Sequence, residues 1–292
     1  MLTFRVLVRG DRLVGVLVHS GKTGSPAASA RRDGADGPAD GAAALELRGL
    51  VKKFGEKLAV DDVTLRVPAG SFYGLVGPNG AGKTTSLSMA VGLLLPDEGS
   101  AHVFGVDVWA DPVQAKASVG VLPDGLSMPE RLTGRELLSY TGRLRGLDRE
   151  TVAARADELI GVLELGGTSE RSLVADYSTG MRKKIGLATA LLHGPKLLVL
   201  DEPFEAVDPV SASTIKRILQ RFVTSGGSVV VSSHVMALVE QICDHVGVIA
   251  GGKVVADGPL DDVRGATTLE ETFVRLVGAH TGGGEGLSWL AS

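Results

Sequence analysis

Residues 77–84 read Gly-Pro-Asn-Gly-Ala-Gly-Lys-Thr, and this stretch decides the fold. It follows the pattern G-x-x-x-x-G-K-[ST], in which a glycine-rich loop turns its backbone N–H groups toward a phosphate. The glycines at 77, 80 and 82 allow this close approach because they carry no Cβ. The apolar run 72–76 predicts a buried strand before the loop, and the residues after it predict a helix whose positive N-terminal end faces the phosphate.

Two side chains complete this predicted phosphate site. Lys83 would supply a positive charge to the β- and γ-phosphates, and the hydroxyl of Thr84 could ligate Mg²⁺. The alternative is a glycine-rich turn that matches the pattern by chance, and the strand before it and the helix after it weigh against that. The sequence therefore predicts ATP and Mg²⁺ as cofactors. The candidate nucleotide-binding residues of this loop are Gly77, Pro78, Asn79, Gly80, Ala81, Gly82, Lys83, Thr84 and Thr85.

A pair of carboxylates follows a second apolar run. Asp201 and Glu202 come directly after Leu197-Leu198-Val199-Leu200. Carboxylates at the exit of a buried strand are costly unless they serve a cation or a water molecule. We expect Asp201 to hold Mg²⁺, directly or through water, and Glu202 to polarise the attacking water. The alternative is that they are two surface acids at a strand end. It is less favoured because the same sequence contains a phosphate loop.

Further motifs extend the pattern along the chain: Tyr177-Ser178-Thr179-Gly180-Met181, then Asp208 and His234. Together with the two phosphate-site motifs, they make residues 45 to about 264 resemble the nucleotide-binding subunit of ABC transporters, of the bacterial drug- and lipid-export type. The resemblance implies an α/β fold. It has a P-loop NTPase core with a RecA-like parallel sheet, an N-terminal antiparallel β subdomain and an inserted helical subdomain that carries the signature motif.

The resemblance also implies roles for particular residues. Ser178 and Gly180 would reach the γ-phosphate held by a second subunit in a head-to-tail dimer, and Asp208 would link the two ATP sites. His234 would join Glu202 in catalysis by contacting the γ-phosphate and orienting the water. Phe54 would stack on adenine. Taken alone, Ser178 could be only a helix N-cap, His234 only structural, and Phe54 only a core aromatic.

Several positions depart from the family pattern, including Glu205-Ala206-Val207, where the family usually has Ser-Gly-Leu. Thr179 replaces a glycine of the signature, and Met181 replaces its glutamine. Asp124 stands where the family has a glutamine that couples Mg²⁺ and water to the membrane partner, so we expect Asp124 near the metal. These changes leave room for weak hydrolysis.

The composition limits the classes of fold and function that the chain can have. The chain has 292 residues, 44% of them hydrophobic, which suits one large α/β domain with a helical insert. A net charge of −4 argues against nonspecific nucleic-acid binding. The single cysteine, Cys243, excludes a disulfide within the chain and is expected to pack in the core. We expect neither a signal peptide nor an apolar run long enough to span a bilayer.

The predicted domain organisation has three parts. Residues 1–44 are an unassigned extension, strand-like over 1–19 and disordered linker over 20–44; the strand-like part is either an accessory strand or an upstream extension. Residues 45–265 form the ATPase domain, with a helical subdomain over about 113–183. Residues 266–292 form a short helix and a flexible tail.

The expected partners are a separate multi-spanning membrane permease and a second ATPase subunit, as an ATP-driven homodimer or a heterodimer. The chain would then lie in the cytoplasm, on the inner face of the membrane. The arginines of the helical subdomain have two equally weighted interpretations. They form a face that docks the permease, or they form a face that is exposed to solvent. One alternative is a soluble ABC-type ATPase acting on ribosomes or nucleic acid, which usually carries tandem domains, coiled coils or zinc clusters. Another is a weakly hydrolysing regulatory subunit.

Overall fold

The structure is a computed structural model that describes residues 2–9, 12–19, 43–125, 127–167 and 171–278. Most of the expected linker, 20–42, and the expected flexible tail, 281–286, lie outside these residues. Residues 43 and 44 are an exception, because the first strand of the core begins at Ala43 rather than at Leu45.

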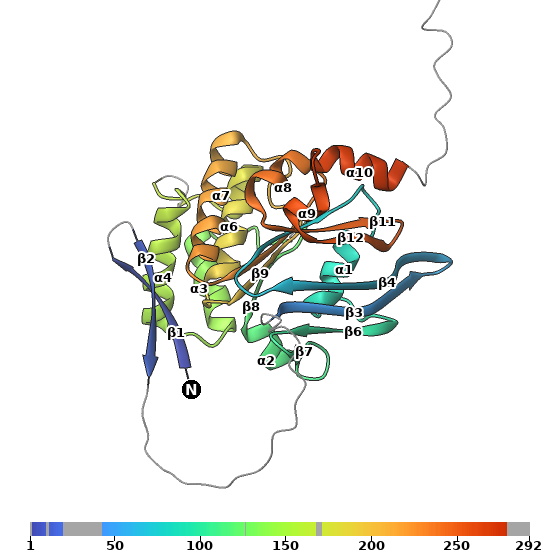
Figure 1. Ribbon diagram of the computed structural model, residues 1–292. Coiled ribbons are helices and arrows are strands. Elements are labelled where there is room, and N and C mark those ends of the chain that lie inside the picture. Colours follow the sequence, from blue (N-terminus) through green and yellow to red (C-terminus); the bar gives the residue numbers. More distant parts are fainter. Residues whose placement is uncertain (1, 10–11, 20–42, 126, 168–170, 279–292) are drawn as a thin grey trace, which may run out of the picture.

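A six-stranded sheet forms the centre of the molecule (Figure 1). Five of its strands run parallel, and the sixth, at one edge, is antiparallel to its neighbour. This arrangement confirms the predicted parallel sheet around the phosphate loop. In spatial order the strands are β12 (Lys253–Pro259), β11 (His245–Ala250), β5 (Phe72–Val76), β10 (Ser228–Ser233), β9 (Leu197–Leu200) and β8 (Val119–Leu122).

Alternate residues of these strands enter two separate cores. On β9, Leu198 and Leu200 pack into one apolar cluster, while Leu197 and Val199 pack into the other. A parallel sheet is covered on both faces, so its strands are apolar at every position rather than at every second one. This explains the unbroken apolar runs of the sequence and holds the carboxyl ends of the strands rigid.

A four-stranded antiparallel sheet packs on one side of this centre, confirming the predicted β subdomain. Its long hairpin places Phe54 opposite Lys57 at the tip. Helix α1 (Lys83–Ala90), which follows the phosphate loop, shares an apolar cluster with this sheet. In spatial order the strands are β4 (Lys57–Pro68), β3 (Ala43–Phe54), β6 (Glu98–Val103) and β7 (Val106–Asp107).

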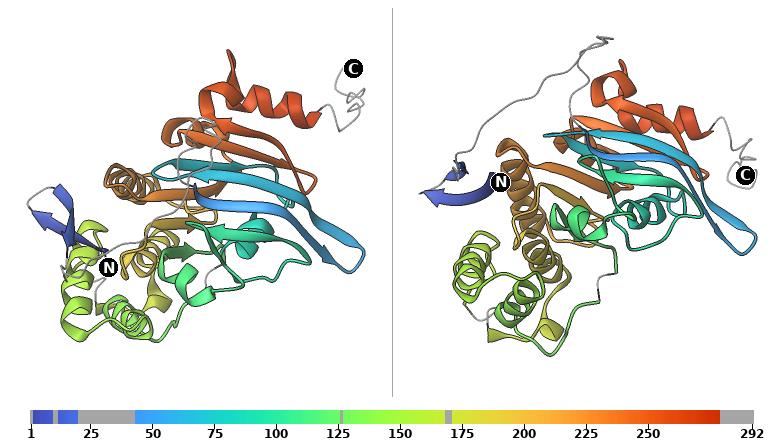
Figure 2. Two further views of the ribbon diagram at one scale, coloured as in Figure 1. Left: turned by 60° about the horizontal axis from the view of Figure 1, so that its bottom comes forward. Right: turned by 90° about the horizontal axis from the view of Figure 1, so that it is seen from below.

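Helices gather on the opposite side of the molecule (Figure 2). Thr133 and Glu136 start α3 with a reciprocal capping box, and Asp148 caps α4. On this side lie α3 (Gly134–Leu144), α4 (Arg149–Val162), the 3₁₀ turn η1 (Val174–Asp176) and α6 (Thr179–Leu191). The short helix α2 (Pro112–Ala117) lies instead against β7 and β8.

The expected start of the helical subdomain, about residue 113, is too early. Val119–Leu122 forms β8, which pairs with β9 inside the central sheet. The helices that stand outside this sheet therefore begin with α3, at Gly134. Strand β8 has only four residues, one of them Gly120, and such a short run carries too weak a pattern to be recognised.

The C-terminal half adds α7 (Pro209–Thr224), α8 (Met236–Ile242), α9 (Leu260–Arg264) and α10 (Leu269–Gly278). Cys243 follows α8 and packs in the core as expected, where burial raises the pKa of its thiol. Near the N-terminus, β1 (Leu2–Arg9) and β2 (Arg12–His19) pair antiparallel as a separate two-stranded sheet.

Across the described ranges, none of the helices is both long enough and apolar enough to cross a membrane.

Candidate active site

A pocket of about 380 Å³ lies over the phosphate loop, bordered by the tip of the β3–β4 hairpin. It collects residues from segments that are far apart in the sequence, including Asp124 and Glu202. Phe54 is 51% exposed at its wall, so this side chain is no core aromatic. The lining residues are Phe54, Lys57, Ala59, Asn79, Gly80, Ala81, Gly82, Lys83, Thr84, Thr85, Asp124, Glu202 and Glu205.

Glycine is required at two positions of the loop. A Cβ at Gly77 would lie 2.2 Å from the carbonyl oxygen of Ile249. Gly82 has a φ of 109° and touches the backbone of Ala59, so a side chain there would be both strained and blocked. Since Gly82 is also the N-cap of α1 and has no side chain to cap it, the first N–H groups of the helix are open to an anion.

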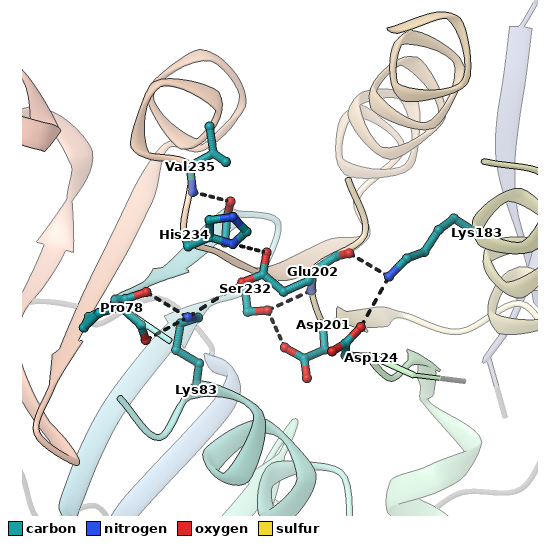
Figure 3. Close-up of polar contacts among 11 residues, drawn as sticks. Pro78, Lys83, Asp124, Lys183, Asp201, Glu202, Ser232, His234 and Val235 are labelled. Atoms are coloured by element: carbon teal, nitrogen blue, oxygen red, sulfur yellow. Dashed lines mark hydrogen bonds and ion pairs between the residues drawn. The ribbon is translucent and has the colours of Figure 1, made fainter. Parts of the chain in front are cut away.

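Lys83 lies back along the loop that precedes it. Its Nζ donates hydrogen bonds to the carbonyl oxygens of Gly77, at 2.8 Å, and Pro78, at 3.3 Å. The same Nζ is 3.7 Å from Oε1 of Glu202 (Figure 3). The side chain is only 6% exposed, so its charge is held between the loop and the carboxylate of Glu202.

Asp201 and Glu202 lie where β9 ends, and both are buried. Ser232, near the end of the adjacent strand β10, joins them: its hydroxyl donates to Oδ1 of Asp201 and accepts from the backbone N–H of Glu202, at 2.9 Å. Glu202 has a φ of 46°, which is uncommon for a side chain with a Cβ. The turn directs its carboxylate away from the core and toward the pocket.

His234 meets Glu202 from the other side. Its Nδ1 lies 3.1 Å from Oε2 of Glu202, a distance at which a protonated Nδ1 donates to the carboxylate. His234 comes directly after β10. The structure thus brings together Lys83, Glu202 and His234, three of the residues that the sequence singled out (Figure 3).

Oxygen donors of the kind that Mg²⁺ takes lie at this site. Thr84 is exposed on the pocket wall, and Asp201 is buried next to Glu202, which lines the same pocket. Asp124 also lines the pocket, but its Oδ1 is 3.7 Å from Nζ of Lys183. In the part of the chain that the structure describes, no group of three or more His, Cys, Asp or Glu side chains could hold a metal by itself. Mg²⁺ commonly binds through one or two protein groups together with phosphates and water, so Thr84 and Asp201 suit it.

Ser178, Gly180 and Asp208 do not line this pocket. Ser178 caps α6 by accepting from the backbone N–H of Met181, at 3.2 Å. Asp208 caps α7 by accepting from the N–H groups of Val210 and Ser211, and the hydrogen bond from Ser211 lowers the pKa of its carboxyl. A Cβ at Gly180 would lie 2.7 Å from Oδ2 of Asp208. The N-termini of α6 and α7 therefore form a second, compact surface.

Sequence reasoning missed several residues of the site. Lys57 and Ala59 enter the pocket from the strand after Phe54, and Ser232 joins the two carboxylates from β10. Lys183 donates to the carbonyl oxygen of Glu202, at 2.8 Å. The serines that end the run 228–233 were a usable signal, because parallel strands bring their carboxyl ends to one edge. No pattern in the sequence points to Lys183.

Comparison with known proteins agrees with this geometry. The profile of the ABC transporter family matches residues 60–205. The chain is 39% identical over 233 residues to "Daunorubicin/doxorubicin resistance ATP-binding protein DrrA" of Streptomyces peucetius, a match that covers 80% of this chain and 70% of that protein. It is 35% identical over 214 residues to "Bacitracin transport ATP-binding protein BcrA" of Enterococcus faecalis, covering 73% and 68%.

The structural likeness points the same way. A solved structure described as "Structure of ATP binding subunit of ABC transporter" superposes with a TM-score of 0.73 at 29% identity, covering 80% of this chain and 98% of that one. The family match includes residues 79–85, Asp124 and Glu202, which line the pocket, and Asp201, which precedes Glu202. The chain belongs to the ABC transporter family, as an ATP-binding ATPase subunit.

Proposed function

We propose that this chain hydrolyses Mg-ATP in a dimer and thereby powers export through a separate membrane permease. One observation supports the dimer. The loop, Lys83 and Glu202 share a pocket, whereas Ser178 and Gly180 stand on a different surface of the same chain. The N-terminus of a helix suits an anion, and the exposed Ser178 hydroxyl, which accepts from Met181, still has its own hydrogen to donate. A second subunit can present this end of α6 to the γ-phosphate.

Each residue has a definite task in this proposal. The loop N–H groups and Lys83 bind the β- and γ-phosphates, Phe54 stacks on adenine, and Thr84 and Asp201 hold Mg²⁺. Bound Mg²⁺ would neutralise charge that develops on the transferred phosphoryl group. Glu202 accepts a hydrogen bond from the attacking water, and His234 holds the Glu202 carboxylate and the water in line with the γ-phosphate.

Closure of the dimer completes the site. The Ser178 hydroxyl and the Gly180 N–H of one subunit would contact the γ-phosphate bound by the other, and closure would exclude all water except the nucleophile. Hydrolysis removes the group that both subunits share, so the open form becomes favoured again. Asp208, packed against Gly180, would couple the two sites.

Export through a permease is supported by the similar proteins, whose names speak of resistance to daunorubicin and doxorubicin and of bacitracin transport. A resistance function suits outward movement of the compound. The chain would work on the cytoplasmic face of the membrane, held there by the permease, either as a homodimer or with a related ATPase.

The test uses Glu202→Gln, which keeps the size of the side chain and removes its charge. We expect it to bind ATP like the wild type, to lose turnover and to accumulate as an ATP-bound dimer. A tagged form purified from detergent-solubilised cells with Mg-ATP should bring a multi-spanning membrane protein with it. Wild-type turnover would overturn the role of Glu202, and a monomer at saturating ATP would overturn the dimer. Capture of ribosomes or nucleic acid instead would support a soluble ATPase.

A further inference from the structure

Lys183 joins three segments that are separate in the sequence. It lies on α6, the helix that begins at the signature motif, and its side chain is 14% exposed. Its Nζ donates to the carbonyl oxygen of Glu202, at 2.8 Å, and lies 3.7 Å from Oδ1 of Asp124 in the pocket wall. Figure 3 shows Lys183 reaching Glu202 and Asp124 from the side opposite Lys83 and His234.

This contact fixes a strained backbone. With a φ of 46°, Glu202 has a left-handed conformation, which is unfavourable for a residue with a Cβ. Three hydrogen bonds hold it: the N–H donates to Ser232, and the carbonyl oxygen accepts from Lys183 at 2.8 Å and from the N–H of Glu205 at 3.3 Å. The bond from Lys183 is the shorter of the two to the carbonyl oxygen. Because the backbone torsions limit where the side chain points, this bond contributes to the direction of the Glu202 carboxylate.

The two contacts of Lys183 differ in strength. A short, mostly buried hydrogen bond from an ammonium group is worth more than a neutral one. The ion pair is longer, and the Asp124 side chain is 46% exposed, so its contribution is small. The bond to Glu202 is therefore the main contact, and Asp124 helps to orient the ammonium group toward it.

We infer that Lys183 is a positioning residue for ATP hydrolysis, which holds Glu202 in the conformation that aims its carboxylate at the attacking water. The inference rests on the proposed role of Glu202. It also links α6 to the carboxylate of Glu202 within one chain. A movement of α6 would therefore displace Glu202 directly.

The experiment compares steady-state ATP hydrolysis and equilibrium ATP binding by the full chain. Lys183→Met removes the donor and keeps the apolar stem; we expect kcat to fall about 10- to 100-fold while the Kd for ATP stays within about 2-fold. Lys183→Arg keeps a cationic donor and should restore most of the rate. Asp124→Asn should lower kcat by less than about 5-fold, in keeping with its exposed ion pair.

Lys216→Met is the matched control, since Lys216 lies on α7 and contacts Gln241 at an exposed position. It should leave both constants unchanged. Thermal melting checks folding, and Lys183→Gln serves as a second variant if the methionine variant is unstable. Loss of folding in both would overturn the inference, because Lys183 would then be needed for structure.

Two results separate this inference from the proposed function. If Lys183→Met keeps wild-type kcat, or loses ATP affinity in parallel with kcat, while Glu202→Gln is inactive, the positioning role is wrong and the proposed function stands. If Glu202→Gln itself turns over ATP like the wild type, the proposed function fails first.

Discussion

Nζ of Lys83 lies 2.8 Å from the carbonyl oxygen of Gly77, so the lysine spans the loop that it closes. Its further contacts, to the carbonyl of Pro78 and the carboxylate of Glu202, come from both sides of the pocket. The loop is thus already folded around a positive charge.

The first prediction concerns this lysine. Lys83→Ala should weaken ATP binding about 10- to 100-fold, since a buried charge-assisted contact to the phosphates is lost, and turnover should disappear. Isothermal titration with ATP measures the affinity. Lys216→Ala, at an exposed site on α7, should bind ATP like the wild type. Unchanged affinity in Lys83→Ala would contradict the site assignment.

The second prediction uses two glycines. In Gly77→Ala, the new Cβ would meet the carbonyl oxygen of Ile249 at 2.2 Å, so the loop must shift. We expect a loss of about 1–3 kcal/mol in the free energy of unfolding, together with weaker ATP binding. Gly161→Ala, in α4 with open space around it, should instead gain about 0.5–1 kcal/mol. Urea unfolding measures both, and a harmless Gly77→Ala would mean that the loop is not tightly packed.

The third prediction tests whether one ATP site is built from two chains. In Gly180→Ala, the Cβ would lie 2.7 Å from both Asp208 Oδ2 and Ser211 Oγ, which should displace the start of α6. We expect this variant to bind ATP normally but not to hydrolyse it. Lys83→Ala should also be inactive, for the different reason that its loop cannot hold ATP.

Mixing the two variants provides the decisive measurement. A mixed dimer has one intact site, made from the loop of the Gly180→Ala chain and the signature of the Lys83→Ala chain. An equal mixture, exchanged freely, should therefore recover about a quarter of wild-type ATPase activity if sites act independently. Activity no higher than that of either variant alone would argue against a shared site.

How far the sequence predicts this structure depends on how local each signal is. The loop 77–84 carries its glycines and lysine at fixed spacing, so the phosphate site and its flanking strand and helix could be predicted. Asp201 and Glu202 follow Leu197–Leu200, which has only four residues, as β8 does, but is leucine or valine at every position and so can be recognised. Each of these signals lies within a few consecutive residues, so it can be recognised without knowledge of the tertiary contacts.

Strand β8 could not be predicted for a physical reason. Gly120 sits within it because a Cβ there would lie 2.2 Å from the carbonyl oxygen of Ala190 on α6. A glycine interrupts the apolar pattern by which a strand is recognised. Here glycine is required by a contact with a helix that is distant in the sequence. The contact of Lys183 with Glu202 is similar, since it joins two elements that only the tertiary fold brings together.

The last prediction concerns pH and His193, which follows α6. Its Nε2 lies 3.0 Å from the carbonyl oxygen of Val119, and burial, helped by the nearby charge of Arg145, lowers its pKa from 6.5 to about 4. Between these two values the unfolded chain binds more protons than the folded one, so the free energy of unfolding falls as pH drops from about 6.5 to about 4. The loss should be on the order of 1–3 kcal/mol. In His193→Gln, the amide can still donate to Val119 but does not titrate, so urea unfolding across this window should show a shallower decline than in the wild type. Equal slopes would mean that folding does not lower the pKa of His193.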